Sequence, residues 1–122
     1  MITKNQIKLI KSLRLKKNRK QSGFFVAEGE KIVDELIESE IDSINLFSTS
    51  EKYKNFKNYI SINSTQLKQI SNQKSPNDVV GIFKIPQVQE IDFDENIVAL
   101  EDINDPGNLG TIIRLCDWFG IK

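Results

Sequence analysis

The apolar positions of the first 85 residues alternate between the period of a helix and that of a strand. Residues 3–14 repeat apolar side chains at helical spacing, and Thr3 followed by Gln6 forms the signature of a capping box. Residues 14–23 lose this periodicity, carry several basic side chains and end in a glycine, so the pattern predicts a basic loop. Residues 24–29 then place two aromatic side chains and a valine before a glycine, which is typical of a short buried strand.

Helix and strand continue to alternate through the following segments. Residues 30–40 predict an amphipathic helix with one apolar side toward the core and one acidic side toward water. Its apolar residues are Ile32, Val33, Leu36 and Ile37. The pattern further predicts strands at 43–49, 59–63 and 78–85, and short helices at 50–56, capped by Ser50, and at 64–71. This alternation is typical of a layered α/β domain rather than of a helical bundle or a β-sandwich.

A change of composition separates the last part of the chain from this first part. Residues 86–95 begin with a proline, lack periodicity and carry four acidic side chains, which predicts a linker. The stretch 97–103, IVALEDI, is apolar at its start, as expected for a strand buried on both faces of a new sheet. The sequence therefore predicts a domain over 1–85, a linker over 86–95 and the start of a second domain over 96–122.

Composition narrows the class of protein. The 122 residues are 39% hydrophobic and 28% charged, which is typical of a folded globular chain rather than a disordered one. No apolar run approaches the roughly 20 residues that a membrane span needs. The single cysteine, Cys116, excludes an internal disulfide, and the lack of histidine excludes a zinc site built from cysteine and histidine. We therefore expect no metal and no membrane partner, in a reducing, cytoplasmic compartment.

The net charge of zero hides a strong asymmetry along the chain. The first 20 residues contain no acidic side chain and eight basic ones, which are Lys4, Lys8, Lys11, Arg14, Lys16, Lys17, Arg19 and Lys20. All 17 acidic side chains lie in the rest of the chain. A basic N-terminal arm on an acidic body indicates contact with a polyanion, most often the phosphate backbone of a nucleic acid. The same lysines could instead form a solvated helix face that only aids solubility.

The segment DPGNLGTIIR, residues 105–114, joins the predicted strand to a predicted helix. Pro106 and Gly107 predict a tight turn, because proline fixes one backbone angle and glycine tolerates the next. Asn108 can cap the helix that follows, and Gly110 removes a side chain from its first turn. The residues expected on the buried side of this helix, before Gly120 ends it, are Ile112, Ile113, Leu115, Cys116 and Phe119.

Two polar residues of this segment, Asn108 and Arg114, are candidates for catalysis or ligand binding. Arg114 should lie within two helical turns of the loop, where its forked cation could reach a phosphate. Taken alone, Asn108 is more often a helix cap than a catalytic group, and Arg114 is more often a surface or ion-pairing arginine. The spacing of the glycines fits neither a dinucleotide-binding fingerprint nor a phosphate-binding P-loop.

The combination of these features is more specific than its parts. LEDINDPGNLGTIIRLCDWFGI, residues 100–121, resembles the first signature motif of the SpoU (TrmH-type) RNA methyltransferases, in the knotted SPOUT superfamily. LKKNRKQSGFFVAEGEKIVDELI, near the N-terminus, resembles the substrate-binding domain that many members carry before the catalytic domain. The resemblance implies a small three-layer α/β/α domain similar to ribosomal RNA-binding proteins. It also implies that the first strand and helix of a truncated, knotted α/β domain follow.

The resemblance further implies an activity. Such enzymes transfer a methyl group from S-adenosylmethionine to the 2′-hydroxyl of an RNA ribose. Asn108 and Arg114 match the functional pair of the motif, with Arg114 as the residue that engages the target nucleotide and helps to remove the hydroxyl proton. Because a free guanidinium group holds its proton up to a pH of about 12, it is a poor base. Three roles of Arg114 are therefore open, namely positioning of the nucleotide, stabilisation of charge, and proton transfer with the help of a phosphate.

The implied protein is longer than this chain. The second and third family motifs, which build the cofactor pocket and the knot, have no counterpart in the 122 residues. We therefore expect an N-terminal part that binds RNA, either rRNA or tRNA, without an S-adenosylmethionine site of its own, in an enzyme that is a homodimer. The RNA contacts are expected from Lys16, Lys17, Arg19 and Lys20. Two rival interpretations are a stand-alone RNA-binding module of the ribosomal-protein type and a generic α/β nucleotide-binding domain.

Overall fold

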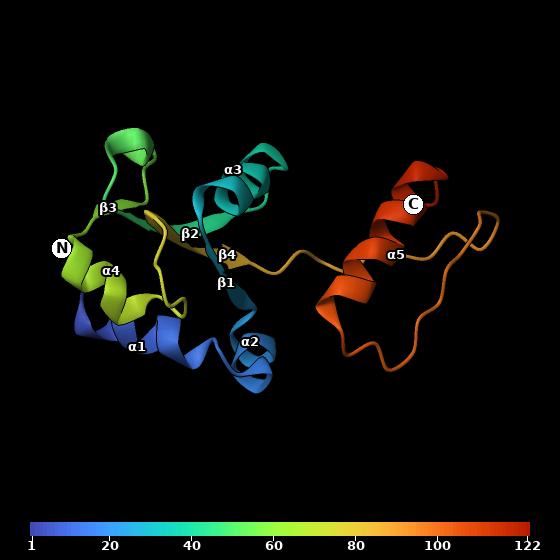
Figure 1. Cartoon of the computed structure of the whole chain (residues 1–122), viewed down its shortest axis with the longest axis horizontal. Helices are drawn as coiled ribbons and strands as arrows, with labels where there is room; N and C mark the ends of the chain where they lie inside the picture. The colour runs from blue at the N-terminus through green and yellow to red at the C-terminus, as the bar shows by residue number, and fades with distance from the viewer. The chain divides into compact units, whose positions relative to one another are not determined.

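In the computed structural model, which describes residues 1–122, the chain forms two units, Met1–Gln87 and Val88–Lys122. The elements of the first unit are α1 (Lys4–Ser12), α2 (Lys16–Ser22), β1 (Phe24–Glu28), α3 (Glu30–Glu38), β2 (Ser43–Ser48), the 3₁₀-helix η1 (Glu51–Tyr53), β3 (Tyr59–Ser61), α4 (Ser64–Ile70) and β4 (Val79–Lys84) (Figure 1). The second unit holds one helix, α5 (Pro106–Trp118). The first unit thus follows the predicted alternation, with α2 as an additional helix.

The four strands of the first unit form one mixed sheet in the order β1-β4-β2-β3. The strand β4 runs antiparallel to both β1 and β2, whereas β3 runs parallel to β2. Residues 79–83 of β4 are all buried. Gly81 suits this crowded position, because a β-carbon there would clash with the ring of Phe83. The last strand of the unit in sequence therefore lies inside its sheet.

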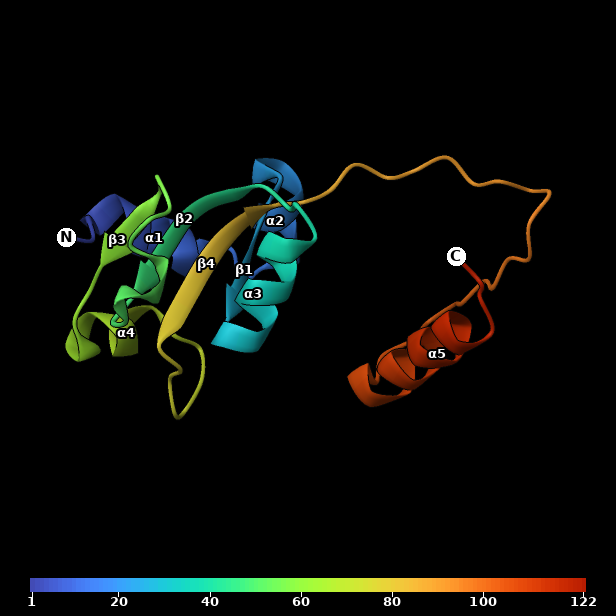
Figure 2. The ribbon, with the colours of Figure 1, turned by 90° about the horizontal axis from the view of Figure 1, so that it is seen from above.

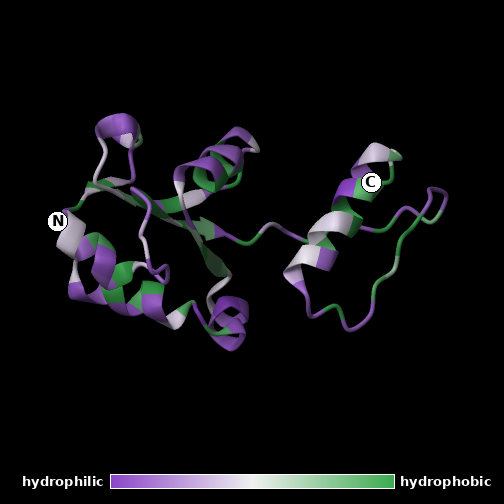
Figure 3. Ribbon diagram, in the orientation of Figure 1, coloured by the Kyte–Doolittle hydropathy of each residue, from purple (hydrophilic) through white to green (hydrophobic).

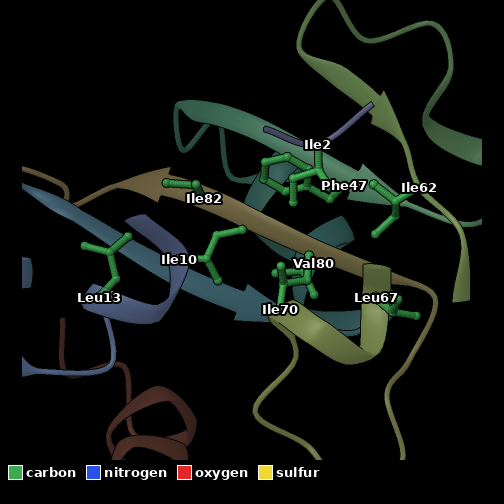
Figure 4. Packing of buried hydrophobic residues seen from close by; sticks show 9 residues of the cluster. All are labelled: Ile2, Ile10, Leu13, Phe47, Ile62, Leu67, Ile70, Val80 and Ile82. Carbon is green, nitrogen blue, oxygen red and sulfur yellow. The ribbon is translucent and has the colours of Figure 1, made fainter. Parts of the chain in front are cut away.

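Helices cover the two faces of the sheet and make three layers (Figure 1, Figure 2). α1, α2 and α4 lie on one face, below the sheet in Figure 1, and α3 lies on the other. The α1 and α4 side buries Ile2, Ile10, Leu13, Phe47, Ile62, Leu67, Ile70, Val80 and Ile82 (Figure 4). The α3 side, which includes η1, buries Ala27, Val33, Leu46, Tyr53, Val79 and Phe83. The predicted α/β/α layering is confirmed, because both faces of the sheet are covered by helices.

Local hydrogen bonds set the starts of α1 and α4. The hydroxyl of Thr3 accepts from the backbone N–H of Gln6 at 3.2 Å, and Gln6 Oε1 accepts from the N–H of Thr3 at 2.8 Å. Asn63 and Gln66 form the same reciprocal pair at the start of α4. Such capping boxes satisfy backbone donors that a helix leaves free in its first turn. The capping box predicted for the first helix is confirmed, and Ser50 caps η1 as predicted.

The prediction of a basic loop at 14–23 is wrong, because residues 16–22 form the helix α2. Its sequence, KKNRKQS, is polar all round, so it has no apolar stripe that could mark it as a helix (Figure 3). Lysine, arginine and glutamine are nevertheless good helix formers. Gly23 ends the helix in the left-handed region at φ 75°, and its N–H donates to the carbonyl of Arg19 at 2.8 Å. The predicted basic arm is therefore folded.

The helix α3 follows the predicted amphipathic pattern with one exception. Val33 is fully buried, and Leu36 and Ile37 are partly buried against the same cluster. Ile32, predicted on the same face, is 52% exposed. Consecutive residues of a helix are turned by about 100°, so two neighbours cannot both point squarely at the sheet, and Val33 holds the inward position. The prediction of a buried side chain is wrong at Ile32.

The second unit differs from the prediction at its start. No strand forms at 97–103, and Ile97, Val98 and Leu100 are each close to half exposed. A strand is held by hydrogen bonds to a neighbouring strand, and the second unit contains no other strand to supply them. The predicted first strand of a new sheet is therefore not found in this chain.

The start of α5 also differs from the prediction. The cap is Asp105, whose Oδ2 accepts from the backbone N–H of Asn108 at 3.0 Å. Asn108 is thus a residue of the first helical turn and not the cap. Pro106 and Gly107 lie in that same turn rather than in a tight turn ahead of the helix, because proline suits the first helical position. At the other end Gly120 stops the helix as predicted, with φ 69°.

The apolar residues of α5 are not buried. Ile113, Leu115 and Phe119 are exposed, and Ile112 and Cys116 are only partly covered. The prediction of a buried side on this helix is wrong for the chain as it stands. The physical reason is that the second unit holds no sheet on which an apolar helix face could pack.

On the α3 side of the sheet, η1 is tied to α3 through one carboxylate. Asp34 accepts hydrogen bonds from Lys52 Nζ and from the hydroxyl of Tyr53, the latter at 2.9 Å. Lys52 also pairs with Glu30 at 3.3 Å. The hydrogen bond from Lys52 holds the pKa of Asp34 below its usual value. Burial, together with the contact to Asp34, raises the pKa of Tyr53 to about 12.

Replacing Tyr53 with phenylalanine should lower the free energy of unfolding by about 1 kcal/mol, because one hydrogen bond to Asp34 is lost. The folded protein keeps the hydroxyl proton up to a pH of about 12, whereas the usual pKa of tyrosine is 10.0. The stability that the hydroxyl adds is therefore complete below pH 10 and is lost as the pH rises through about 12. Urea unfolding of both proteins measures this difference. If the difference in free energy of unfolding between the two proteins stays constant from pH 10 to about pH 12, the hydrogen bond from Tyr53 to Asp34 is not its source.

Candidate nucleic-acid interface

The two helical layers of the first unit carry opposite charge. Residues 1–22, which form α1 and α2, contain eight lysine and arginine side chains and no acidic one. α4 adds Lys68 on the same side of the sheet. Residues 30–42, which contain α3, hold six acidic side chains and one basic one, Lys31. A polyanion is therefore attracted to the α1 and α2 side of the domain and repelled from the α3 side.

The lysines of α1 and α2 are free to meet a ligand. The exposed ones are Lys4, Lys8 and Lys11 on α1 and Lys16, Lys17 and Lys20 on α2. Those of α1 are spaced by four and three residues, so they share one face of the helix. Every salt bridge of the chain involves Lys52 or Lys54, so none neutralises these six lysines. We call the surface formed by these six residues the basic layer.

One of the predicted RNA-contact residues has a second role. The predicted set is Lys16, Lys17, Arg19 and Lys20, and α2 carries all four. Arg19 alone among them is partly buried. Its Nη1 donates to the carbonyl of Leu13 at 2.9 Å and to that of Arg14 at 2.8 Å. These carbonyls follow the end of α1, where a helix leaves acceptors without partners, so Arg19 fastens α2 to α1.

Two neighbours complete this corner between the helices. Asn18 Nδ2 donates to the carbonyl of Ser12 at 2.8 Å, which is a further contact from α2 to the end of α1. Arg14 Nη2 donates to the carbonyl of Ser71 at 3.2 Å and so connects the ends of α1 and α4. The sequence prediction omits Arg14 from the contact residues. Its partner lies 57 positions away, so no local pattern could reveal the contact.

The sequence FVAEG, residues 25–29, lies within the N-terminal stretch that resembles the substrate-binding domain, and it connects distant parts of the first unit. One carboxylate oxygen of Glu28 accepts from the hydroxyl of Ser71 at 2.6 Å, and the other accepts from the N–H of Asn72 at 2.8 Å. Gly29 has φ 102°, a backbone angle that residues with a side chain rarely adopt. A β-carbon there would also lie 3.3 Å from Asn77 Nδ2. The motif therefore fixes the segment after α4 against the end of β1.

In the second unit, α5 carries both residues that the sequence predicts as catalytic. Asn108 lies in the first turn, Arg114 lies six residues further on, and both are exposed. Six residues of helix advance by about 9 Å and turn by about 240°, so the two side chains leave the helix in different directions. α5 alone does not bring them together. Arg114 shares a helix face with Thr111, Leu115 and Trp118, which surround a shallow hollow.

Neither a cluster of metal ligands nor a membrane-spanning helix is found in the chain. No group of three or more cysteine, aspartate or glutamate side chains gathers where it could hold a metal ion. None of the helices combines the length and the apolar character needed to cross a bilayer.

Comparison with known sequences identifies the family of the first unit. Residues 4–81 match the family model described as MRM3-like substrate binding domain. The chain is 28% identical over 127 residues to the 23S rRNA (guanosine(2553)-2'-O)-methyltransferase RlmP of Bacillus subtilis (strain 168). That match covers 97% of the chain and 50% of the Bacillus protein. The chain belongs to the MRM3-like substrate-binding domain family.

Solved structures of RNA methyltransferases also resemble this chain. A putative RNA methyltransferase of the TrmH family from Porphyromonas gingivalis matches with a TM-score of 0.80 and 30% identity, over 100% of this chain and 51% of that one. An AdoMet-bound rRNA methyltransferase from Sinorhizobium meliloti matches with a TM-score of 0.64 and 27% identity, over 96% of this chain and 49% of that one. The resemblance to SpoU (TrmH-type) RNA methyltransferases is confirmed. The chain spans about half the length of these relatives.

Proposed function

We propose that the chain is the RNA-recognition part, with the first catalytic residues, of an rRNA ribose 2′-O-methyltransferase that uses S-adenosylmethionine. Residues 1–85 bind the RNA, 86–95 are a linker and 96–122 begin the methyltransferase domain. The name of the Bacillus relative supports the substrate and the reaction, and the AdoMet-bound structure of the Sinorhizobium protein supports the cofactor. Because those relatives are about twice as long, the activity is assigned to the whole protein and not to these 122 residues.

The observation that carries this proposal is the basic layer on a domain of this family. Each phosphate of RNA is negatively charged, and a lysine that replaces its counterion gains affinity from the release of that ion. The acidic α3 lies on the opposite face of the sheet. RNA is therefore held on the α1 and α2 side of the domain, in one orientation.

Asn108 and Arg114 are assigned to the catalytic step. A guanidinium fork can hold a phosphate or ribose oxygen in a fixed direction, and the exposed side chain of Arg114 is available for this. Arg114 positions the target nucleotide and stabilises charge as the proton leaves the 2′-hydroxyl, and Asn108 shapes the pocket around it. S-adenosylmethionine, which supplies the methyl group, is held by residues outside this chain. The resemblance to the family supports a homodimer, and the free Cys116 is consistent with a reducing cytoplasm.

Mapping of ribose methylation in RNA from cells that lack the gene tests this function. The proposed enzyme predicts that at least one 2′-O-methyl group disappears from rRNA and returns when the complete gene is supplied again. The complete gene with Arg114→Ala serves as the control for the methyl-transfer step, and it should not restore the modification. An unchanged pattern of ribose methylation in the deletion strain would contradict the proposed function.

A further inference from the structure

An open pocket of about 370 Å³ lies beside the basic layer, at the corner where α1 ends and α2 begins. We call it the corner pocket. Its lining comes from α1 and the two residues that follow it, from α2, from the edge strand β1, and from the end of α4 with the segment after it. Leu13 and Ile70 are buried and give it an apolar floor, while Arg14 and Asn72 are exposed at its rim. Its volume falls in the range of roughly 300–1,000 Å³ that is typical of sites for small ligands.

Two guanidinium groups line the corner pocket, and both donate hydrogen bonds to backbone carbonyls. Arg19 is held by the carbonyls of Leu13 and Arg14, and Arg14 is held by the carbonyl of Ser71. Each guanidinium has five N–H donors, so these contacts leave further donors free on both residues. A planar cation held in this way can stack on an aromatic ring with little loss of side-chain entropy. The corner pocket therefore suits a flat, aromatic ligand.

The other polar groups of the pocket determine which part of an RNA could enter it. The carboxylate of Glu28 lines the pocket and repels a phosphate group. The hydrogen bonds that Glu28 accepts from Ser71 and Asn72 hold it in place, but carboxylate oxygens have lone pairs for more than one donor each. The side-chain amide of Asn72, at the rim, can both donate and accept. This arrangement fits a neutral ring with donors and acceptors on its edge, while the charged phosphates fit the lysines outside.

We propose that the corner pocket receives one unpaired nucleobase of the RNA, with the flanking phosphates on the basic layer. This inference rests on the proposed function, because the inference specifies which part of the first unit contacts the RNA. A base within a duplex has both faces covered and cannot enter, so the nucleotide must come from a loop, a bulge or an end. The apolar floor and the guanidinium planes contact the faces of the ring, and Glu28 and Asn72 contact its edge. The first unit therefore selects RNA that presents an extruded base.

Two RNA hairpins that differ only in the bases of the loop test the proposal. One carries a loop of unpaired adenosines, and the other carries abasic ribose phosphates at the same positions, so the two have equal backbone charge. Fluorescence anisotropy measures the affinity of the complete 122-residue chain for each hairpin over a range of salt concentrations. The adenosine loop should bind about tenfold more tightly or better, because stacking of a base on a planar side chain is lost in the abasic RNA. Both hairpins should have the same salt dependence, because their phosphates are the same.

Two variants separate the pocket from the lysines around it. Arg14→Lys keeps the charge but loses the planar group, so it should remove most of the preference for the adenosine loop and leave the salt dependence unchanged. Lys8→Ala, on the exposed face of α1, should lower the slope of log affinity against log salt by about one and leave the preference intact. Asn72→Ala changes an exposed side chain and keeps the backbone N–H that donates to Glu28, so it tests the edge of the pocket without removing that hydrogen bond.

Three outcomes are decisive. If the unmodified chain binds both hairpins equally and with a normal salt dependence, the base-binding pocket is wrong and RNA binding by the basic layer stands. A preference that survives both Arg14→Lys and Asn72→Ala would place the base elsewhere and overturn the assignment to the corner pocket. No binding of either hairpin at low salt would overturn the proposed function together with this inference.

Discussion

Replacing Arg114 with lysine in the complete protein should slow the proposed methyl transfer by a factor of about 10²–10³, the usual cost of one positioned donor that stabilises charge. Lysine keeps the positive charge but has one compact ammonium group in place of a planar fork. It therefore cannot hold two oxygens of the target nucleotide in one orientation. Single-turnover methylation of the RNA measures the rate. Titration with S-adenosylmethionine should give nearly unchanged affinity, because we assign the cofactor site to other residues.

Thermal unfolding of the same two proteins is the control for this prediction. Lysine keeps the positive charge and the long aliphatic stem of arginine, and Arg114 makes no salt bridge in this chain, so a catalytic Arg114 predicts a change in the free energy of unfolding of no more than about 0.5 kcal/mol. A purely structural Arg114 would give the opposite result, with a clear loss of stability and near-normal turnover in the folded protein. That result would remove Arg114 from the catalytic step.

The second large effect is expected from the basic layer. Changing Lys16, Lys17 and Lys20 together to alanine should weaken the binding of structured RNA on the order of 10- to 100-fold at low salt, through the loss of counterion release. The slope of log affinity against log salt should fall by about one for each phosphate contact that is lost. All three side chains are exposed and make no salt bridge, so the fold should be unaffected. Arg19 is excluded from this variant because it fastens α2 to α1.

A matched variant keeps the same change of net charge but moves it away from the basic layer. Lys31, Lys54 and Lys57 are exposed and lie outside α1, α2 and α4, so their joint change to alanine also removes three positive charges. Its RNA affinity should stay within about threefold of that of the unmodified chain, because long-range effects of exposed charges are screened by salt. Equal losses in both triple variants would show that only net charge matters and would contradict a specific RNA-binding face.

The parts of the fold that depend on nearby residues could be predicted from the sequence. Thr3 and Gln6 cap α1 because both partners lie within one helical turn, and such pairs are readable in the sequence. The strands β1 and β4 were predictable because their apolar and aromatic runs are bounded by turn residues. The alternation of these segments predicts a layered α/β domain, and the resemblance to the family implies that its layers number three.

The parts that depend on distant partners could not be predicted. α2 has no apolar stripe, and its attachment through Arg19 and Asn18 to the end of α1 is visible only in three dimensions. The contact of Arg14 with Ser71 is of the same kind. The apolar run at 97–103 reads as a strand, but a strand also needs a neighbour, which the second unit does not supply. The predictions for these segments are wrong or incomplete because the local sequence pattern does not show which distant residues each segment will contact.

The start of α5 shows a different limit. Asp105, Asn108 and the proline between them are all compatible with a helix start, so the sequence could not decide between two capping residues. In the structure Asp105 takes that place, which frees the side chain of Asn108 from a capping role. This outcome leaves Asn108 available for the function that the family motif implies for it.

Binding of RNA to one helical layer of the first unit is tested most directly by amide chemical shifts. The adenosine-loop hairpin is added to the isotope-labelled 122-residue chain, and the shift of each backbone amide is followed. The largest changes should fall in α1, α2 and the segment that follows α4, where the lysines and the corner pocket lie. The amides of α3, on the acidic side, should be nearly unaffected. Changes that are largest in α3, or that are equal in both helical layers, would contradict the assignment of RNA binding to the basic layer.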